Sequence, residues 1–250
     1  MHGQGKLFIS RYTQRMNLLA FETATEACSV AIWVDGQVRE RFEIAPRRHT
    51  ELALPWAEGL LAEAGIRRSQ LDAIAVGRGP GAFTGVRLAI GIAQGIALAL
   101  DRPVIAVSSL AALALRANVS GRCLAAIDAR MGEVYLGAFE CDGDGARGLA
   151  PEVVIKPELA QIPEGDGWHA AGTGFAAVDG ALQLRLQGRL LGLDASALPH
   201  AADVARLAAR AFARGEGQAP ERIEPAYLRN DVALTSVQQQ ALRKPGSRTT

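Results

Sequence analysis

Residues 77–95 read GRGPGAFTGVRLAIGIAQG, and the rest of the chain is organised around them. The apolar run 71–76 precedes this stretch and predicts a buried strand. Glycines at 77, 79, 81 and 85 predict a turn whose backbone approaches another group closely. A helix is expected to begin near Thr84 and to run over 85–100. The loop offers backbone N–H groups to an anion such as phosphate. In the helix, glycines and alanines spaced every four residues suit close packing of a second helix. We therefore expect a bound phosphate, a partner helix or both here.

The elements around this stretch predict a ribonuclease-H-like order. Asp35-Gly36 joins two apolar runs, as in a two-residue hairpin turn. Antiparallel strands come first and strand–helix–strand crossovers follow, which predicts an α/β fold with a mixed sheet flanked by helices. The expected elements are strands at 17–22, 28–34, 37–44, 71–76 and 103–107, and helices at 50–64, 85–100 and from Ser108 or Ser109 to Arg116.

The pattern restarts after residue 118, which indicates a second unit of the same kind. Residues 123–128 are apolar and end in an acid, as 18–22 do, and aligning Glu22 with Asp128 also places Val30 on Leu136. We therefore expect two tandem ribonuclease-H-like domains, at 16–118 and 119–235. Two unrelated strand–turn–strand pieces are the alternative. Later expected elements are strands at 153–155 and 168–171, a helix at 202–214 and an extended segment at 225–230, with 175–200 unassigned.

Composition and chain ends bound the class of protein. The chain has 250 residues, 49% apolar and 21% charged, with a formal net charge of +1, so any RNA contact is expected to come mainly through a partner. Three cysteines without metal-ligand spacing favour a reducing cytosol, and no apolar run approaches the ~18 residues of a membrane span. We expect a cytoplasmic protein. Residues 1–15 do not read as a signal peptide and are expected to be a disordered extension, and 236–250 a disordered tail.

Two glycine-rich loops and two acids are candidates for a nucleotide or phosphate site. Glu22 and Asp128 end the first strands of the two units, where kinases and ATPases of the actin and sugar-kinase type place acids that hold Mg²⁺. The loop 77–85 is no Walker A motif, because it lacks the lysine. The competing interpretation is that these residues only shape turns. For Glu22 the two interpretations are evenly matched, and for Asp128 the turn is favoured. The candidate residues are Glu22, Thr23, Gly79, Gly81, Thr84, Gly172 and Gly174.

No set of residues predicts catalysis or metal binding by this chain. The four histidines form no i, i+4 pair, and His49 is interpreted as a helix-entry residue. A Gly-x-Ser-x-Gly motif is absent, and no cysteine has a histidine nearby in sequence. The polar turn 130–135 is either an ordinary hairpin loop or a lining of a cleft through Arg130, Glu133 and Tyr135.

Five blocks, in a fixed order, carry a resemblance to a known family. They are FETATEACSVA (21–31), PRRHTE (46–51), GRGPGAFTGVR (77–87), AIDARMGEVY (126–135) and EPAYLRN (224–230). Together they resemble the bacterial TsaB family, also called YeaZ, over residues 16–233. The resemblance implies two actin-like ATPase domains. It also implies a non-catalytic subunit in the formation of N6-threonylcarbamoyladenosine at position 37 of tRNAs that read codons beginning with A.

The resemblance further implies partners and the surface that meets them. They are the paralogous TsaD transferase, the TsaE ATPase and, through the complex, tRNA; the isolated chain is expected to form a homodimer, and no membrane is implied. The domain 16–118 is expected to pair with the transferase through helices 50–64 and 85–100. Its expected contact residues are Leu52, Trp56, Leu60, Val86, Leu88, Gly91, Ile92 and Gly95.

A comparison of ligands with the paralogue favours a scaffold role. The resemblance implies that the transferase holds its metal with a His-x-x-x-His pair on the helix equivalent to 46–64. This chain has Ala45 and His49 at that spacing, so half of the pair is missing. No intrinsic cofactor is expected, although ATP or ADP with Mg²⁺ is an expectation for the complex interface. Two departures are Glu22, where many relatives have Asp, and the additional residues 1–15.

Three alternatives stay open. An active kinase or ATPase of the same fold would turn over nucleotide alone. A metallopeptidase, as in the older glycoprotease label, would contain metal. A ribonuclease-H-like nuclease needs about three or four carboxylates around two metals, for which only Glu22 and Asp128 are candidates.

Overall fold

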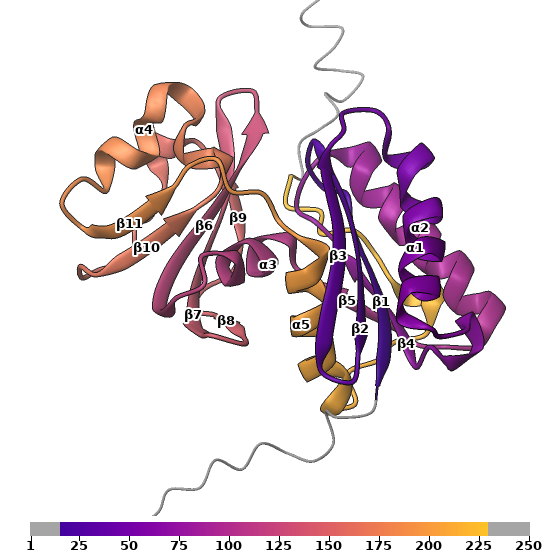
Figure 1. Cartoon of the computed structure of the whole chain (residues 1–250). Coiled ribbons are helices and arrows are strands. Elements are labelled where there is room, and N and C mark those ends of the chain that lie inside the picture. The colour runs from indigo at the N-terminus through magenta and orange to yellow at the C-terminus, as the bar shows by residue number, and fades with distance from the viewer. Residues whose placement is uncertain (1–15, 230–250) are drawn as a thin grey trace, which may run out of the picture.

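The computed structural model describes residues 16–229, which form two α/β units side by side (Figure 1). The first contains β1 (Asn17–Glu22), β2 (Ala27–Val34), β3 (Gln37–Ile44), α1 (His49–Ala64), β4 (Ala73–Gly77), α2 (Phe83–Leu100), β5 (Val104–Val107) and α3 (Ser109–Arg116). The second contains β6 (Ser120–Arg130), β7 (Glu133–Asp142), β8 (Ala146–Gly148), β9 (Val153–Ile155), β10 (Trp168–Ala171), α4 (Ala177–Arg185) and β11 (Leu190–Asp194), and α5 (Ala201–Ala213) follows. The termini predicted to be disordered, 1–15 and 236–250, lie outside the described residues.

The first sheet has the predicted topology. Its strand order is β3-β2-β1-β4-β5, with β1, β2 and β3 antiparallel and with β4 and β5 parallel to β1. Asp35 and Gly36 both have positive φ, 51° and 83°, as a two-residue turn between twisted strands requires. Local turn chemistry therefore sets the register of this hairpin.

The second sheet repeats the first, which confirms the predicted tandem fold. Its order is β11-β10-β6-β7-β8, so β6, β7, β10 and β11 take the places of β1, β2, β4 and β5. β10 is parallel to β6, and β7 is antiparallel to it. β8 and β9 both pair with β7, where the first unit has β3 alone. A bulge between Asp128 and Arg130 shifts the pairing of β6 with β7, a feature that β1 and β2 lack.

Helices cover both faces of the first sheet. α1 and α2 share one core with the sheet, in which Phe21, Leu60 and Ile74 are buried. α2 contributes Ala89, Ala93 and Ala97, all fully buried, so its axis lies close to the strands. By length and composition alone, α2 is apolar enough to cross a membrane, contrary to our expectation that no segment reached that limit. Ala89, Ala93 and Ala97 place one face of α2 against the sheet, but only 33% of this apolar window is buried within the chain.

α5 requires a correction to the expected domain boundary. The sequence assigned it to 119–235, but it packs on the other face of the first sheet. Its alanines meet Ala20, Ala31 and Ala75 of the strands, so small side chains on both sides allow close contact. α3 lies between this helix and the second sheet, as Figure 1 shows. The break at 118 thus separates the sheets, but the covering helices cross it.

Side chains from the first sheet hold the start of α5. The N–H of Ala201 donates to Ser29 Oγ at 2.8 Å, and that of Ala202 donates to Glu40 Oε1 at 3.0 Å. His200 Nδ1 lies 2.9 Å from Glu40 Oε2. Burial by itself would raise the pKa of Glu40, but hydrogen bonds from His200, Ser29 and Ala202 hold it below its ordinary value. Strands β2 and β3 therefore cap a helix far away in sequence.

Candidate functional site

Glu22 and Thr23 point into the first unit and are already hydrogen-bonded. Glu22 is 1% exposed; its Oε1 accepts from the N–H of Ala24 and its Oε2 from Ser109 Oγ, each at 2.7 Å. Thr23 Oγ1 donates to the carbonyl of Gly85 at 2.7 Å. Burial raises the pKa of Glu22, and the hydrogen bonds only partly oppose this. Neither side chain is available to a nucleotide in this structure.

The glycines of the loop after β4 make room for the β1–β2 turn. A Cβ at Gly77 would lie 1.9 Å from Glu22 Oε2, and a Cβ at Gly85 would lie 2.0 Å from the carbonyl oxygen of Thr23. A Cβ at Gly81 would lie 2.3 Å from the carbonyl oxygen of Ala24. Among the four, only Gly79 has a positive φ, 88°. Close packing therefore accounts for this glycine pattern.

Gly172 and Gly174 have the same role in the second unit. Gly172 has a φ of 117°, and its Cβ would lie 2.1 Å from the carbonyl oxygen of Ala126 on β6. A Cβ at Gly174 would meet the Ala126 side chain at 2.7 Å. Both glycines let the turn after β10 lie against β6. Thr84, by contrast, is exposed in the first turn of α2. These loops offer no independent support for a phosphate site.

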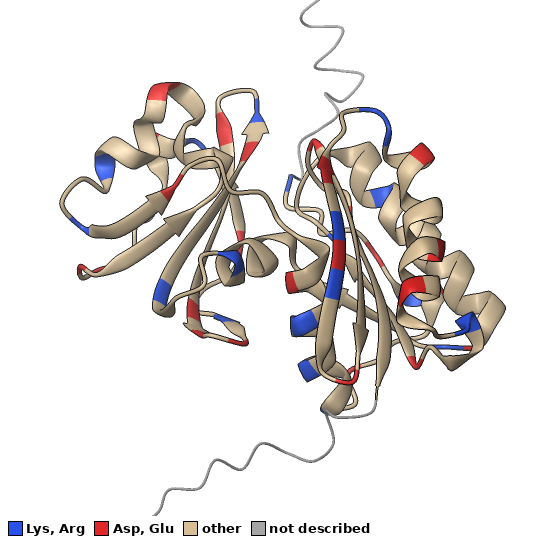
Figure 2. Cartoon of the chain, in the orientation of Figure 1, with Lys and Arg blue, Asp and Glu red and all other residues tan. Residues whose placement is uncertain are grey.

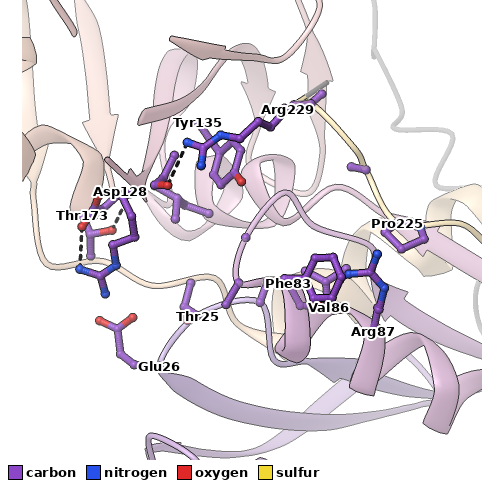
Figure 3. A pocket seen from close by; sticks show the side chains of 18 of the residues that line it. Thr25, Glu26, Phe83, Val86, Arg87, Asp128, Tyr135, Thr173, Pro225 and Arg229 are labelled. Carbon is purple, nitrogen blue, oxygen red and sulfur yellow. Dashed lines mark hydrogen bonds and ion pairs between the residues drawn. The ribbon is translucent and has the colours of Figure 1, made fainter. Parts of the chain in front are cut away.

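A cavity of about 950 Å³ separates the two units (Figure 3). The β1–β2 turn, the start of α1 and the start of α2 form one wall, and the end of β6 forms the other. The extended segment after α5 runs across it. Residues that line the cavity include Thr25, Glu26, Arg47, Phe83, Arg87, Asp128, Arg130, Tyr135, Thr173, Tyr227 and Arg229.

The polar turn 130–135 divides between the cavity and its rim. Arg130 and Tyr135 line the cavity as expected. Asp128 Oδ1 accepts from the N–H of Arg130 at 2.8 Å and its Oδ2 faces the Arg130 guanidinium at 2.9 Å, so Asp128 stabilises the turn. Glu133 forms an ion pair with Arg229.

Aromatic and arginine side chains that the sequence did not single out form part of the cavity wall. The guanidinium of Arg87 lies 3.2 Å from the ring centroid of Phe83 and donates to the hydroxyl of Tyr227. Phe83 is 67% exposed and Tyr227 is 56% exposed. The blocks 77–87 and 224–230 contain all three residues, but nothing local shows that those blocks meet.

His49 lies in the cavity wall and is hydrogen-bonded to the backbone of the same chain. Its Nε2 lies 3.1 Å from the carbonyl oxygen of Thr25 and 3.2 Å from that of Ala27, so this nitrogen carries the proton and donates. His49 is also the first residue of α1, as its interpretation as a helix-entry residue requires. Within residues 16–229, no three His, Cys, Asp or Glu side chains gather as a metal ligand set.

The expected partner residues of α1 and α2 differ in exposure. Leu60 and Val86 are 1% and 4% exposed in the first core, so their assignment to a partner surface has to be corrected. Gly91 and Gly95 are exposed, and a Cβ at either would meet nothing within 4 Å. Leu52, Trp56, Leu88 and Ile92 are half-buried. The glycine face of α2 is thus open, whereas the larger side chains are shared with the core.

Comparisons with known proteins identify the family. Residues 42–244 match the family model described as TsaD, tRNA N6-adenosine threonylcarbamoyltransferase. The chain is 46% identical over 231 residues to the tRNA threonylcarbamoyladenosine biosynthesis protein TsaB of Escherichia coli K12, covering 87% of this chain and 96% of that protein. The chain belongs to the TsaB family. The protein of the same name from Haemophilus influenzae is 39% identical over 232 residues, covering 88% of this chain and 96% of that protein.

A solved family structure agrees with the fold. The structure titled YeaZ from Pseudomonas aeruginosa is 49% identical in sequence and matches with a TM-score of 0.79, covering 85% of this chain and 100% of that chain. Together with the two matching sheets described above, this confirms two tandem actin-like domains.

Proposed function

We propose that this chain is a non-catalytic subunit in tRNA threonylcarbamoyladenosine biosynthesis, active through pairing with the TsaD transferase. The observation that carries the proposal is the 46% identity over almost the whole length of a protein named for that process. The expected modification is N6-threonylcarbamoyladenosine at position 37 of tRNAs that read codons beginning with A.

The contacts within the chain support a non-catalytic role. Glu22, the acid best placed by sequence for Mg²⁺, is buried and accepts two hydrogen bonds. His49 donates to two backbone carbonyls, and Ala45 stands where a His-x-x-x-His pair would have its first histidine. These side chains are already used to build the β1–β2 turn. Chemistry at the complex therefore has to be supplied by the partner.

The open face of α2 is the surface we propose for TsaD. Gly91 and Gly95 let a partner helix approach the backbone. Leu98 on the same helix is 62% exposed, and Leu54 of α1 is 49% exposed. In the isolated chain the same face is proposed to pair with a second copy. Figure 2 shows acidic and basic residues mixed over both units, so tRNA and TsaE are proposed to act through the complex.

The substitution Gly91→Leu tests this surface. A Cβ at Gly91 meets nothing within 4 Å, so the isolated chain accommodates leucine, whereas a closely packed partner does not. Overpacking of about 1–3 kcal/mol corresponds to a Kd for TsaD raised about 10- to 100-fold. Ala213→Leu, an exposed position at the end of α5, is the matched control. Unchanged affinity of Gly91→Leu for TsaD would exclude this surface while leaving the family function intact.

Reconstitution tests the function itself. Modification of tRNA by TsaD and TsaE is expected to require this chain, which alone is expected to turn over no nucleotide. Substantial ATP turnover by the purified chain would favour the kinase or ATPase alternative, and stoichiometric metal would favour the metallopeptidase. Full modification in its absence would refute the proposal. ATP or ADP with Mg²⁺ at the subunit junction, and a cytoplasmic location, stay predictions.

A further inference from the structure

The chain crosses between the two units three times within residues 16–229. The first crossing leads from α3 to β6 and the second from β11 to α5. The third is the segment 218–229, here called the strap, which leaves the first unit after α5 and reaches the second unit beside the cavity, where Figure 3 shows Arg229. No sequence pattern predicted a role for the strap beyond an extended conformation.

The strap is anchored along the first unit. Gln218 exchanges two backbone hydrogen bonds with Val104 of β5, at 2.9 and 3.0 Å. The side chain of Ile223 is 4% exposed in the core beneath α2, and Gln94 Nε2 donates to the carbonyl of Pro220 at 2.8 Å. The N–H of Ala226 donates to the carbonyl of Arg78 at 2.8 Å. The first nine residues of the strap therefore move with the first unit.

The last residue of the strap, Arg229, binds the second unit through two contacts. The guanidinium of Arg229 forms an ion pair with Glu133 at the start of β7 and donates to the carbonyl of Ala129 on β6 at 3.2 Å. It thus holds both strands of one hairpin on either side of its turn. The side chains of Arg229 and Glu133 are only 21% and 29% exposed, so water screens the pair less than a surface ion pair.

The contact of Arg229 with the second unit lies in the wall of the cavity. Arg229, Leu228 and Tyr227 all line the cavity, and Tyr227 is joined to Arg87 on the opposite unit. Away from the cavity the units meet through α3 and α5, where Leu207 packs against both neighbouring cores. A tie across the cavity, far from these contacts, would oppose a rotation of one unit against the other.

We propose that the strap sets the opening of the cavity between the units, with the Arg229 guanidinium as its latch on Glu133 and Ala129. Release of the latch frees the second unit to rotate about the α3–β6 and β11–α5 crossings. The cavity then widens while both sheets stay folded. This proposal concerns the chain alone and does not depend on the partner or on tRNA.

Spin labels on the two units provide the test. Spin labels on cysteines introduced at the exposed positions Thr50 and Ala176 report the inter-unit distance in the full chain, measured by pulsed electron paramagnetic resonance. The native cysteines are buried, and the chain without introduced cysteines measures their background labelling. Arg229→Ala and Glu133→Gln are each expected to shift the distance distribution to longer values. The double variant is expected to add nothing beyond Arg229→Ala, because that substitution already removes the ion pair with Glu133.

Two variants make the result decisive. Arg229→Lys keeps the charge but loses the planar fork, so an intermediate distribution is expected. Arg222→Ala removes an exposed arginine of the same strap and is expected to leave the distribution unchanged. An unchanged distribution in Arg229→Ala would refute the latch. So would a loss of far-ultraviolet circular dichroism in that variant, because Arg229 would then maintain the fold itself.

Discussion

The contacts of the loop glycines predict that the same substitution has opposite effects at two places in α2. Gly85→Ala places a methyl group 2.0 Å from the backbone carbonyl oxygen of Thr23, which cannot move away without distorting the β1–β2 turn. This overpacking is at the upper end of the usual cost, about 3 kcal/mol, and the gain in helix propensity offsets about 0.5–1 kcal/mol of it. A net loss of about 2 kcal/mol in the free energy of unfolding is expected, which lowers Tm by about 4–8 °C.

Gly91→Ala is the matched control on the same helix. Within one chain its methyl group meets nothing within 4 Å, so at protein concentrations too low for self-association only the propensity gain of about 0.5–1 kcal/mol remains. Its Tm is expected to rise by about 1–4 °C. Both values come from thermal unfolding followed by circular dichroism and from urea titration. Equal shifts in the two variants, or a more stable Gly85→Ala, would refute the packing explanation of the loop glycines.

Three further outcomes follow from buried or paired charges. Burial raises the pKa of Glu22 above its ordinary value of 4.5, so its contribution to stability is present below pH 4.5 and is lost as the pH rises through the folded value. Glu22→Gln should therefore gain stability relative to the native chain as the pH rises above 4.5 in urea titrations, and a difference that stays constant with pH would contradict this. The pKa of Glu40 is lowered, so Glu40→Gln should be destabilised at pH 7 by about 1–3 kcal/mol, a gap that must close as the pH falls below 4.5. Arg210→Ala removes a bidentate ion pair with Asp142, and the two side chains are 42% and 60% exposed. The free energy of unfolding is therefore expected to fall by less than about 1 kcal/mol in urea titrations, and a larger fall would contradict this.

The sequence by itself determined the local elements and their order. The Asp35-Gly36 turn, a serine cap at Ser108 or Ser109 and the apolar runs of the strands depend on neighbouring residues, so periodicity and turn chemistry were enough to predict them; the structure assigns the cap to Ser108. The order of elements then limited the sheets to one topology, and the five blocks identified the family. The predicted repeat of the two units had the same origin.

Only the tertiary structure decided which of these elements meet. α5 packs on the first sheet because alanines face alanines there, a match that no window of sequence contains. Glu22 and the glycines at 77, 81 and 85 are explained by one close contact between the β1–β2 turn and the loop after β4. The strap joins Arg229 to Glu133 across the cavity, which depends on the placement of both units. Contacts between residues far apart in sequence depend on the shape and volume of both partners, and a one-dimensional pattern records neither.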